Sequence, residues 1–149
     1  MSVEERLMKD LKQAMKNKDV IKKNTIQLIR TAIFNARIEK PDLTEREIED
    51  VIMSERKKRE ESKIQFEKVH RNDMIEEVNK EILCIETYLP QQFSDLELEN
   101  AVNEIIKQEN ITDIKLLGYA IKKVKEKYGN RASGKRISDM VKKVLGENI

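Results

Sequence analysis

The sequence is poor in the residue types on which many functional sites depend. Its 149 residues include one cysteine, one histidine, two prolines and four glycines, and only 4% of them are aromatic. The single cysteine, Cys84, cannot form a disulfide within the chain, and one cysteine with one histidine excludes an ordinary structural zinc site in a monomer. If His70 and Cys84 share one helix, fourteen residues separate them by about 21 Å along its axis, too far for a thiol–imidazole pair.

Catalytic groups of other kinds are equally scarce. The six serines are isolated from one another, which excludes an amidase-type serine pair. Glu60 and Glu61, like Glu76 and Glu77, are adjacent in sequence, and adjacent side chains diverge on a helix instead of forming an acid–base pair. We therefore expect solvated helix faces there, no catalysis by the chain alone, and no metal or cofactor.

Long apolar segments are also absent. No run of about 18 apolar residues is present, so the sequence predicts no membrane span. Residues 1–5 are charged and contain no hydrophobic signal region. We expect a cytoplasmic location.

Charged residues, in contrast, make up 39% of the chain, and apolar residues recur at helical spacing almost throughout. Because strand-forming residues are sparse and Leu, Ile, Lys and Glu abound, we expect an all-α protein. Pro90 interrupts the helical pattern and predicts a domain boundary. The expected domains are a helical N-terminal domain of long helices at residues 1–89 and a small three-helix C-terminal bundle at residues 90–149.

Helix boundaries follow from local patterns. Thr44 with Glu47, and Ser94 with Glu97, form capping boxes that predict helix starts. A further helix is expected to begin after Thr112 or Asp113 and to end at Gly129, and the last to run from about Ser133 to Leu145. The residues expected to face inward from the helix ending at Gly129 are Ile114, Leu117, Ile121, Val124 and Tyr128. Residues 55–71 are mostly polar, so that part of the preceding helix needs a partner or projects into solvent.

Positive charge is concentrated near the C-terminus. Residues 115–143 contain ten basic and two acidic residues, a net charge of +8, whereas the whole chain carries only +2. A strongly basic segment of this kind predicts an acidic partner, and nucleic acid is the first candidate.

The basic residues of this segment gather in two places. At 100° per residue, Lys115, Gly118, Lys122 and Lys125 fall within one narrow sector beside the apolar stripe of their helix. Arg131, Lys135 and Arg136 lie at the start of the last helix, whose free N–H groups also attract anions. A glycine inside a helix costs about 1 kcal/mol relative to alanine, so Gly118 indicates a close approach to the backbone. Either a phosphate or a neighbouring helix would explain that approach, and the lysines would in the second case only solubilise.

The same segment contains an apparent phosphate-binding loop, in which Gly129 is followed five residues later by Gly134 and Lys135. That motif needs a preceding strand and a Ser or Thr after the lysine to bind magnesium. Here a helix precedes the loop and Arg136 follows the lysine, so we do not expect ATP or GTP binding.

Several stretches are similar to one family. Residues 86–92 (Glu-Thr-Tyr-Leu-Pro-Gln-Gln), followed by Ser94 and Leu98, resemble the mid-chain signature of the GatB/YqeY family. The Gly118 helix and the loop at residues 129–135 resemble its C-terminal signature. Further similarities to the free-standing YqeY-like members, which extend the resemblance to essentially the whole chain, are Arg30 with Ala32 and residues 57–62 before residues 66–68.

The resemblance implies a two-part all-α protein, similar to the C-terminal tail of the B subunit of the tRNA-dependent amidotransferase. In that enzyme the tail binds tRNA, while separate domains and subunits perform the amidation. Members of the family are commonly labelled carbon–nitrogen ligases with glutamine as amido-N-donor, but this chain lacks the kinase and amidase parts. Carried over residue by residue, the resemblance assigns RNA contact to Gly118, Arg131, Gly134 and Lys135. At Ser133, where the family has an acid, a serine can also cap the helix.

Two non-catalytic functions follow as hypotheses, beside a third hypothesis that the chain itself supplies an amidotransferase activity, which failure of the purified chain to hydrolyse glutamine would exclude. The first is a non-catalytic tRNA-binding or amidotransferase-associated protein whose partner is tRNA or another folded RNA. The second is a protein–protein adaptor, because residues 41–114 contain ten basic and twenty acidic residues in long polar helices. In that case the helices of residues 41–89 would contact the protein partner.

Overall fold

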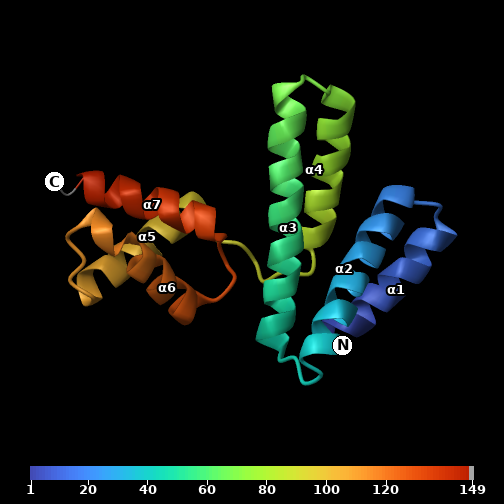
Figure 1. Cartoon of the computed structure of the whole chain (residues 1–149), viewed down its shortest axis with the longest axis horizontal. Helices are drawn as coiled ribbons and strands as arrows, with labels where there is room; N and C mark the ends of the chain where they lie inside the picture. Colours follow the sequence, from blue (N-terminus) through green and yellow to red (C-terminus); the bar gives the residue numbers. More distant parts are fainter. Residues whose placement is uncertain (148–149) are drawn as a thin grey trace. The chain divides into compact units, whose positions relative to one another are not determined.

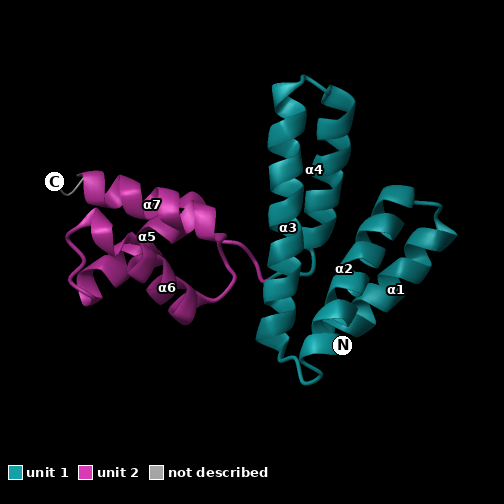
Figure 2. Cartoon of the chain, viewed as in Figure 1, with its two compact units in different colours: residues 1–89 teal, residues 90–149 magenta. Residues whose placement is uncertain are grey.

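The structure is a computed structural model that describes residues 1–147. Within these residues all regular secondary structure is helical, with seven α-helices and one short 3₁₀ helix (Figure 1). The expectation of an all-α protein is confirmed. Contacts between residues divide the chain into two compact units, Met1–Leu89 and Pro90–Ile149 (Figure 2).

Unit 1 consists of α1 (Val3–Lys16), α2 (Val20–Glu39), α3 (Glu45–Lys68) and α4 (Asn72–Glu86). Consecutive helices form two hairpins, α1–α2 and α3–α4, and α2 packs against both helices of the second hairpin (Figure 1). The largest fully buried side chains of its core are Leu7, Ile26, Ile29, Ile52 and Ile85.

The capping boxes predicted from the sequence are confirmed. The Thr44 hydroxyl accepts a hydrogen bond from the backbone N–H of Glu47 at 3.1 Å, and the Glu47 carboxylate accepts one from the Thr44 N–H at 3.2 Å. Ser94 and Glu97 repeat this arrangement at the start of α5 (Asp95–Gln108). Local hydrogen bonding therefore determines where both helices begin.

The polar part of α3 has a partner, and that partner is α4. The Arg56 guanidinium donates to the Glu86 carboxylate at 2.8 and 3.0 Å, and Arg59 Nε lies 3.2 Å from a Glu81 carboxylate oxygen. These side chains are largely covered, so charge pairing replaces apolar packing along this part of the hairpin.

Unit 2 contains α5, the 3₁₀ helix η1 (Ile114–Leu116), α6 (Leu117–Tyr128) and α7 (Gly134–Glu147). The three α-helices contact one another pairwise around a core in which Leu98, Val102, Val124, Ile137 and Val141 are fully buried. The expected three-helix C-terminal cluster is confirmed by these contacts.

One predicted inward residue is wrong. Ile114 is 49% exposed because the helical segment after Asp113 begins with a 3₁₀ turn instead of an α-helical turn. The Asp113 side chain accepts from the Lys115 N–H at 3.0 Å, and the Asp113 carbonyl accepts from the Leu116 N–H at 3.0 Å. The tighter turn has about three residues per turn, so the 100° projection does not hold at this position.

The C-terminal end of α6 agrees with the prediction. Gly129 has a φ of +68°, a conformation that favours glycine, and its N–H donates to the Lys125 carbonyl at 2.9 Å. No helix in residues 1–147 is both long enough and apolar enough to cross a bilayer.

Candidate nucleic-acid interface

The predicted basic sector lies partly on η1 and partly on α6. Gly118, Lys122 and Lys125 occupy positions i, i+4 and i+7 of α6 and therefore share one helix face. Lys115 belongs to η1, so it reaches this surface from the preceding turn. Lys115 and Lys122 are exposed, and Lys125 is half-buried.

Gly118 is exposed, and no atom of the described chain lies within 4 Å of the position that a Cβ would occupy. A neighbouring helix therefore does not explain the glycine. The contact between Gly118 and a phosphate that the sequence suggested stays a prediction.

The structure brings the α6 sector close to the start of α7. A Cβ on Gly134 would lie 3.9 Å from Lys125 Cε and 4.0 Å from Lys125 Nζ. At the same helix end the Ser133 hydroxyl accepts from the Arg136 N–H at 3.2 Å, so serine caps α7 as expected. Lys135 follows in the first turn and is exposed.

The lysines of unit 2, apart from Lys125, fall into two sets. Lys127 pairs with Glu104, Lys143 lies 3.9 Å from Glu99, and Lys123 lies 3.9 Å from Glu109. These three carboxylates belong to α5 or the residue after it, so that side of the unit is neutralised. The hydrogen bond that Lys127 donates to the Glu104 carboxylate raises the pKa of Lys127 and lowers the pKa of Glu104.

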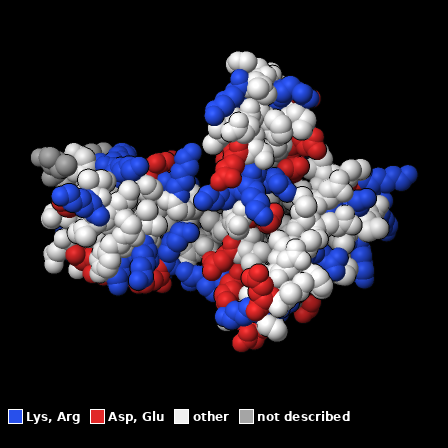
Figure 3. Space-filling model, in the orientation of Figure 1, with Lys and Arg blue, Asp and Glu red and all other residues white. Residues whose placement is uncertain are grey.

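The second set has no carboxylate partner among the described side chains. Its members are Lys107 on α5 and, outside α5, Lys115, Lys122, Lys135 and Lys142. In the view of Figure 3, Lys and Arg side chains lie over α6 and α7 of unit 2. The excess positive charge of unit 2 is therefore concentrated on side chains that are free to meet an anion.

Arg131 and Arg136, in contrast, contact the chain itself. Arg131 Nε donates to the Gln91 carbonyl at 3.1 Å, and its guanidinium lies 4.1 Å from the centre of the Phe93 ring. Arg136 donates to the Phe93 carbonyl at 2.8 Å and to the Asp95 carboxylate at 3.1 Å. Arg131 in the loop before α7 and Arg136 in the first turn of α7 thus both bind residues 91–93, a role that the sequence did not reveal because the acceptors are about forty positions away.

The mid-chain signature, residues 86–92, makes structural contacts within each of the two units. In unit 1 the Thr87 carbonyl accepts from Arg6 at 2.7 Å, and the Tyr88 hydroxyl donates to Asp10 at 2.5 Å. Burial first, and then this hydrogen bond, raise the pKa of Tyr88. In unit 2 Gln92 donates to the carbonyls of Pro90 and Asn130 at 2.9 and 2.8 Å. These residues complete the packing of each unit.

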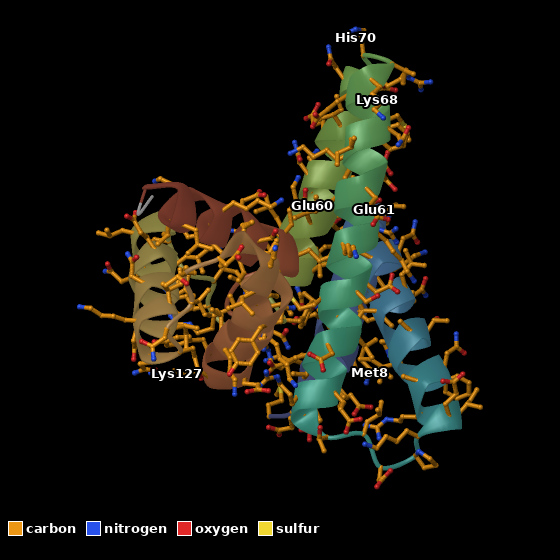
Figure 4. All side chains as sticks on the ribbon, turned by 60° about the vertical axis from the view of Figure 1, so that its left-hand side comes forward. Met8, Glu60, Glu61, Lys68, His70 and Lys127 are labelled. Carbon is orange, nitrogen blue, oxygen red and sulfur yellow. The ribbon has the colours of Figure 1, made fainter. Side chains whose placement is uncertain are left out.

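His70 and Cys84 lie at opposite ends of α4. His70 is in the turn before α4, at the tip of the hairpin (Figure 4), and Cys84 is near the C-terminal end of the helix. Burial raises the pKa of the Cys84 thiol to about 11, so the thiol is protonated at neutral pH. Their separation confirms that they form no thiol–imidazole pair.

The paired glutamates do not form a site either. Glu60 lies 3.4 Å from Arg56, whereas Glu61 is on a different side of α3 (Figure 4). Within residues 1–147 no three His, Cys, Asp or Glu side chains are grouped as metal ligands. The expectations of no metal and no cofactor stay predictions.

One relative in the comparison with known proteins is the altered inheritance of mitochondria protein 41, mitochondrial, of Lachancea thermotolerans. It is 34% identical over 104 residues, which are 67% of this chain and 56% of the relative. The chain therefore matches little more than half of that protein. The name places the Lachancea protein in mitochondria, and the cytoplasmic location expected for this chain stays a prediction.

The family assignment rests on a match along nearly the whole chain. The sequence model of the Yqey-like protein family matches residues 4–145, which include both signatures, the whole of α2 to α6 and nearly all of α1 and α7. The chain therefore belongs to the YqeY-like family.

Proposed function

We propose that this protein binds folded RNA, with tRNA as the first candidate, through the exposed lysines of unit 2 and without catalysing a reaction itself. The observation that carries the proposal is that Lys115, Lys122 and Lys135 have no carboxylate partner among the described residues, although α5 neutralises other lysines of the same unit. The bare backbone at Gly118 lies among these lysines and leaves room for a phosphate.

Contacts to phosphates position an RNA on a protein. Such contacts require exposed lysines on a surface and do not require a pocket. Stacking of bases has little support in unit 2. Tyr119 is 42% exposed, but its hydroxyl donates to Glu109 at 3.2 Å and Lys123 lies over its ring. Recognition of RNA by backbone and shape is therefore the mode that this surface favours.

The test is binding of the purified chain to total tRNA, compared with an RNA duplex of similar length, over a range of salt concentrations. We expect binding at low salt that weakens as salt rises, and tighter binding to tRNA than to the duplex. Lys122→Glu and Lys135→Glu are each expected to weaken binding and flatten its salt dependence. No complex at low salt, where phosphate contacts are strongest, would refute the proposal.

The adaptor function is the second candidate, and exposed apolar residues on the α3–α4 hairpin favour it. Val69 and Leu83 are each more than half exposed on this otherwise polar hairpin. A stable protein partner that is recovered through residues 41–89 after nuclease treatment would support the adaptor over the RNA-binding protein. Glutamine hydrolysis by the purified chain would contradict both, because each is non-catalytic.

A further inference from the structure

The α1–α2 hairpin has an apolar outer face that no described part of unit 1 covers. Phe34 and Ile38 are 66% and 67% exposed on α2, and Met8 of α1 is 37% exposed. Ile29 and Ile33, on the other side of α2, are buried in the core. The hairpin therefore has two apolar faces, and only one of them is buried in the core of unit 1. Clusters of exposed large apolar side chains on a soluble domain mark interaction surfaces.

The outer face is grooved where the two helices meet. A hollow of about 190 Å³ lies between α1 and α2, with Leu7 and Ile33 at its base and Met8 and Phe34 at its rim. Met8 is labelled in Figure 4. Since α1 packs mainly against α2, the flank of α1 beside this groove is also open. A groove between two helices fits the side chains of a third helix.

The rim of the groove is basic. Arg37 pairs with Glu4 at one end, whereas Arg30 lines the same hollow and has no partner among the described residues. Lys9 and Lys12 line the adjoining hollow with Met8 and Glu5, and neither lysine is in an ion pair among the described residues. Residues 1–40 as a whole contain ten basic and five acidic residues.

We propose that this groove docks an amphipathic helix of a partner protein, with apolar side chains against Met8 and Phe34 and with Asp or Glu side chains toward Arg30 and the lysines. Charge complementarity selects the acidic partner. A second copy docked symmetrically would place basic rim against basic rim, which disfavours it. RNA phosphates would use the lysines but leave Ile38 and Met8 without a role.

Aromatic residues, methionine and arginine are the types enriched at the centre of protein interfaces. Phe34 and Arg30 are one helical turn apart, so one partner helix contacts both. This surface belongs to unit 1, whereas the proposed RNA contacts belong to unit 2, so either proposal can fail without the other.

The test places a photo-crosslinking amino acid, benzoylphenylalanine, at Phe34 of the full chain in the cells that produce it. The matched control carries the same group at Leu96, which is about equally exposed on α5 of unit 2. We expect a protein adduct at position 34 that is absent at position 96. Mass spectrometry is expected to map it to a helix with apolar residues one turn apart and flanking Asp or Glu.

Charge dependence completes the test. Arg30→Glu in the crosslinking chain is expected to reduce the adduct about tenfold, as for loss of a hot-spot residue, whereas Lys68→Glu at the end of α3 leaves it unchanged. An adduct with RNA, with lipid, with a second copy of this chain or with a protein segment lacking acidic residues would overturn the proposal. Equal yields at positions 34 and 96 would overturn it as well.

Discussion

At the residue scale, the proposed RNA surface contains a helical glycine that the packing of unit 2 does not require. Gly118 and Gly146 both lie in helices of unit 2, and neither would bring a Cβ within 4 Å of a described atom. Alanine is the better helix former by up to about 1 kcal/mol. Both glycines therefore reduce stability, but only Gly118 lies among the unpaired lysines.

Gly118→Ala is expected to raise the free energy of unfolding by up to about 1 kcal/mol and at the same time to weaken tRNA binding. The added methyl group fills the space that we assign to the RNA backbone. Urea denaturation and fluorescence anisotropy with labelled tRNA measure the two effects. Gly146→Ala is the control, with the same direction of stability change and unaltered binding. If Gly118→Ala leaves binding unaltered too, the glycine is not part of the RNA surface.

The neighbouring residues Lys135 and Arg136 have different roles despite their equal charge. Arg136→Gln is expected to lower the free energy of unfolding of unit 2 by about 1–3 kcal/mol, because the Phe93 carbonyl and Asp95 lose their charged donor. Lys135→Gln, at an exposed position without a partner, is expected to change it by less than about 0.5 kcal/mol. Urea denaturation followed by circular dichroism compares the two. Equal effects would contradict a structural role for Arg136.

Cys84 provides a test of burial in unit 1. Because burial raises the pKa of its thiol from 9.0 to about 11, the folded state disfavours the thiolate. The protonated thiol therefore contributes to the stability of the folded state below pH 9.0, and this contribution to stability is lost as pH rises toward about 11.

Alkylation by iodoacetamide at about pH 8 is expected to be up to about 100-fold slower in the folded chain than in urea, because a smaller fraction is thiolate. Because the sequence contains one cysteine, the measured alkylation rate reports on Cys84 alone. Equal rates would show that the thiol is not buried.

At the element scale, the α3–α4 hairpin depends on ion pairs where most hairpins use apolar contacts. Burial raises the pKa of Glu81 in spite of the nearby Arg59, so the cost of burying this carboxylate exceeds the attraction. Arg59 Nε is itself buried without a well-formed hydrogen bond, although Glu81 is 3.2 Å away. The pair is thus a weak contributor to stability, but losing one member leaves the other uncompensated.

Arg59→Met is expected to destabilise the chain at about pH 7 by roughly 1–3 kcal/mol, since it leaves a half-buried Glu81 carboxylate. The loss is expected to shrink toward about pH 4, where that carboxyl takes up a proton. Adding Glu81→Leu is expected to restore most of the stability at neutral pH. Urea denaturation of both variants at the two pH values measures this, and a pH-independent loss would contradict the expectation.

Elements with local signals were predictable from the sequence. The capping boxes at Thr44 and Ser94, the break at Pro90 and the end of α6 at Gly129 all involve residues close in the chain. The 3₁₀ turn at Ile114 was not predictable, because periodicity assumes one helix type. The ion-pair partners of Arg56 and Arg59 were not predictable for a different reason, because both pairs depend on how α3 and α4 pack against each other.

The candidate site was predictable only in part for the same physical reason. Lysines 115, 122 and 135 could be identified by charge and helical spacing, but which basic residues are neutralised depends on contacts across unit 2. Arg131 and Arg136 have the positive charge that is typical of RNA contacts, yet both donate hydrogen bonds to backbone carbonyls at or near Phe93. Phe34 gave no signal in the sequence, because exposure of one aromatic residue on an otherwise amphipathic helix depends on tertiary packing.

At the scale of the whole molecule, charge is separated along the chain. Residues 1–40 are basic, residues 41–114 carry a net charge of −10, and residues 115–143 carry +8. Each unit has its own core, and each presents a surface that its own folding does not need. In unit 2 that surface is the set of unpaired lysines, and in unit 1 it is the groove between α1 and α2. We therefore propose two separate binding surfaces, one on each unit.

Comparison of two double variants in tRNA binding across a salt series tests the central claim most directly. Lys122→Gln with Lys135→Gln removes two unpaired charges, and Lys127→Gln with Lys143→Gln removes two that face Glu104 and Glu99. Both change the net charge equally. The first pair is expected to weaken binding about tenfold or more at low salt and to reduce the slope of log affinity against log salt by about two. The second is expected to leave both nearly unchanged, and equal losses from the two variants, or none from either, would contradict the assignment of the RNA surface.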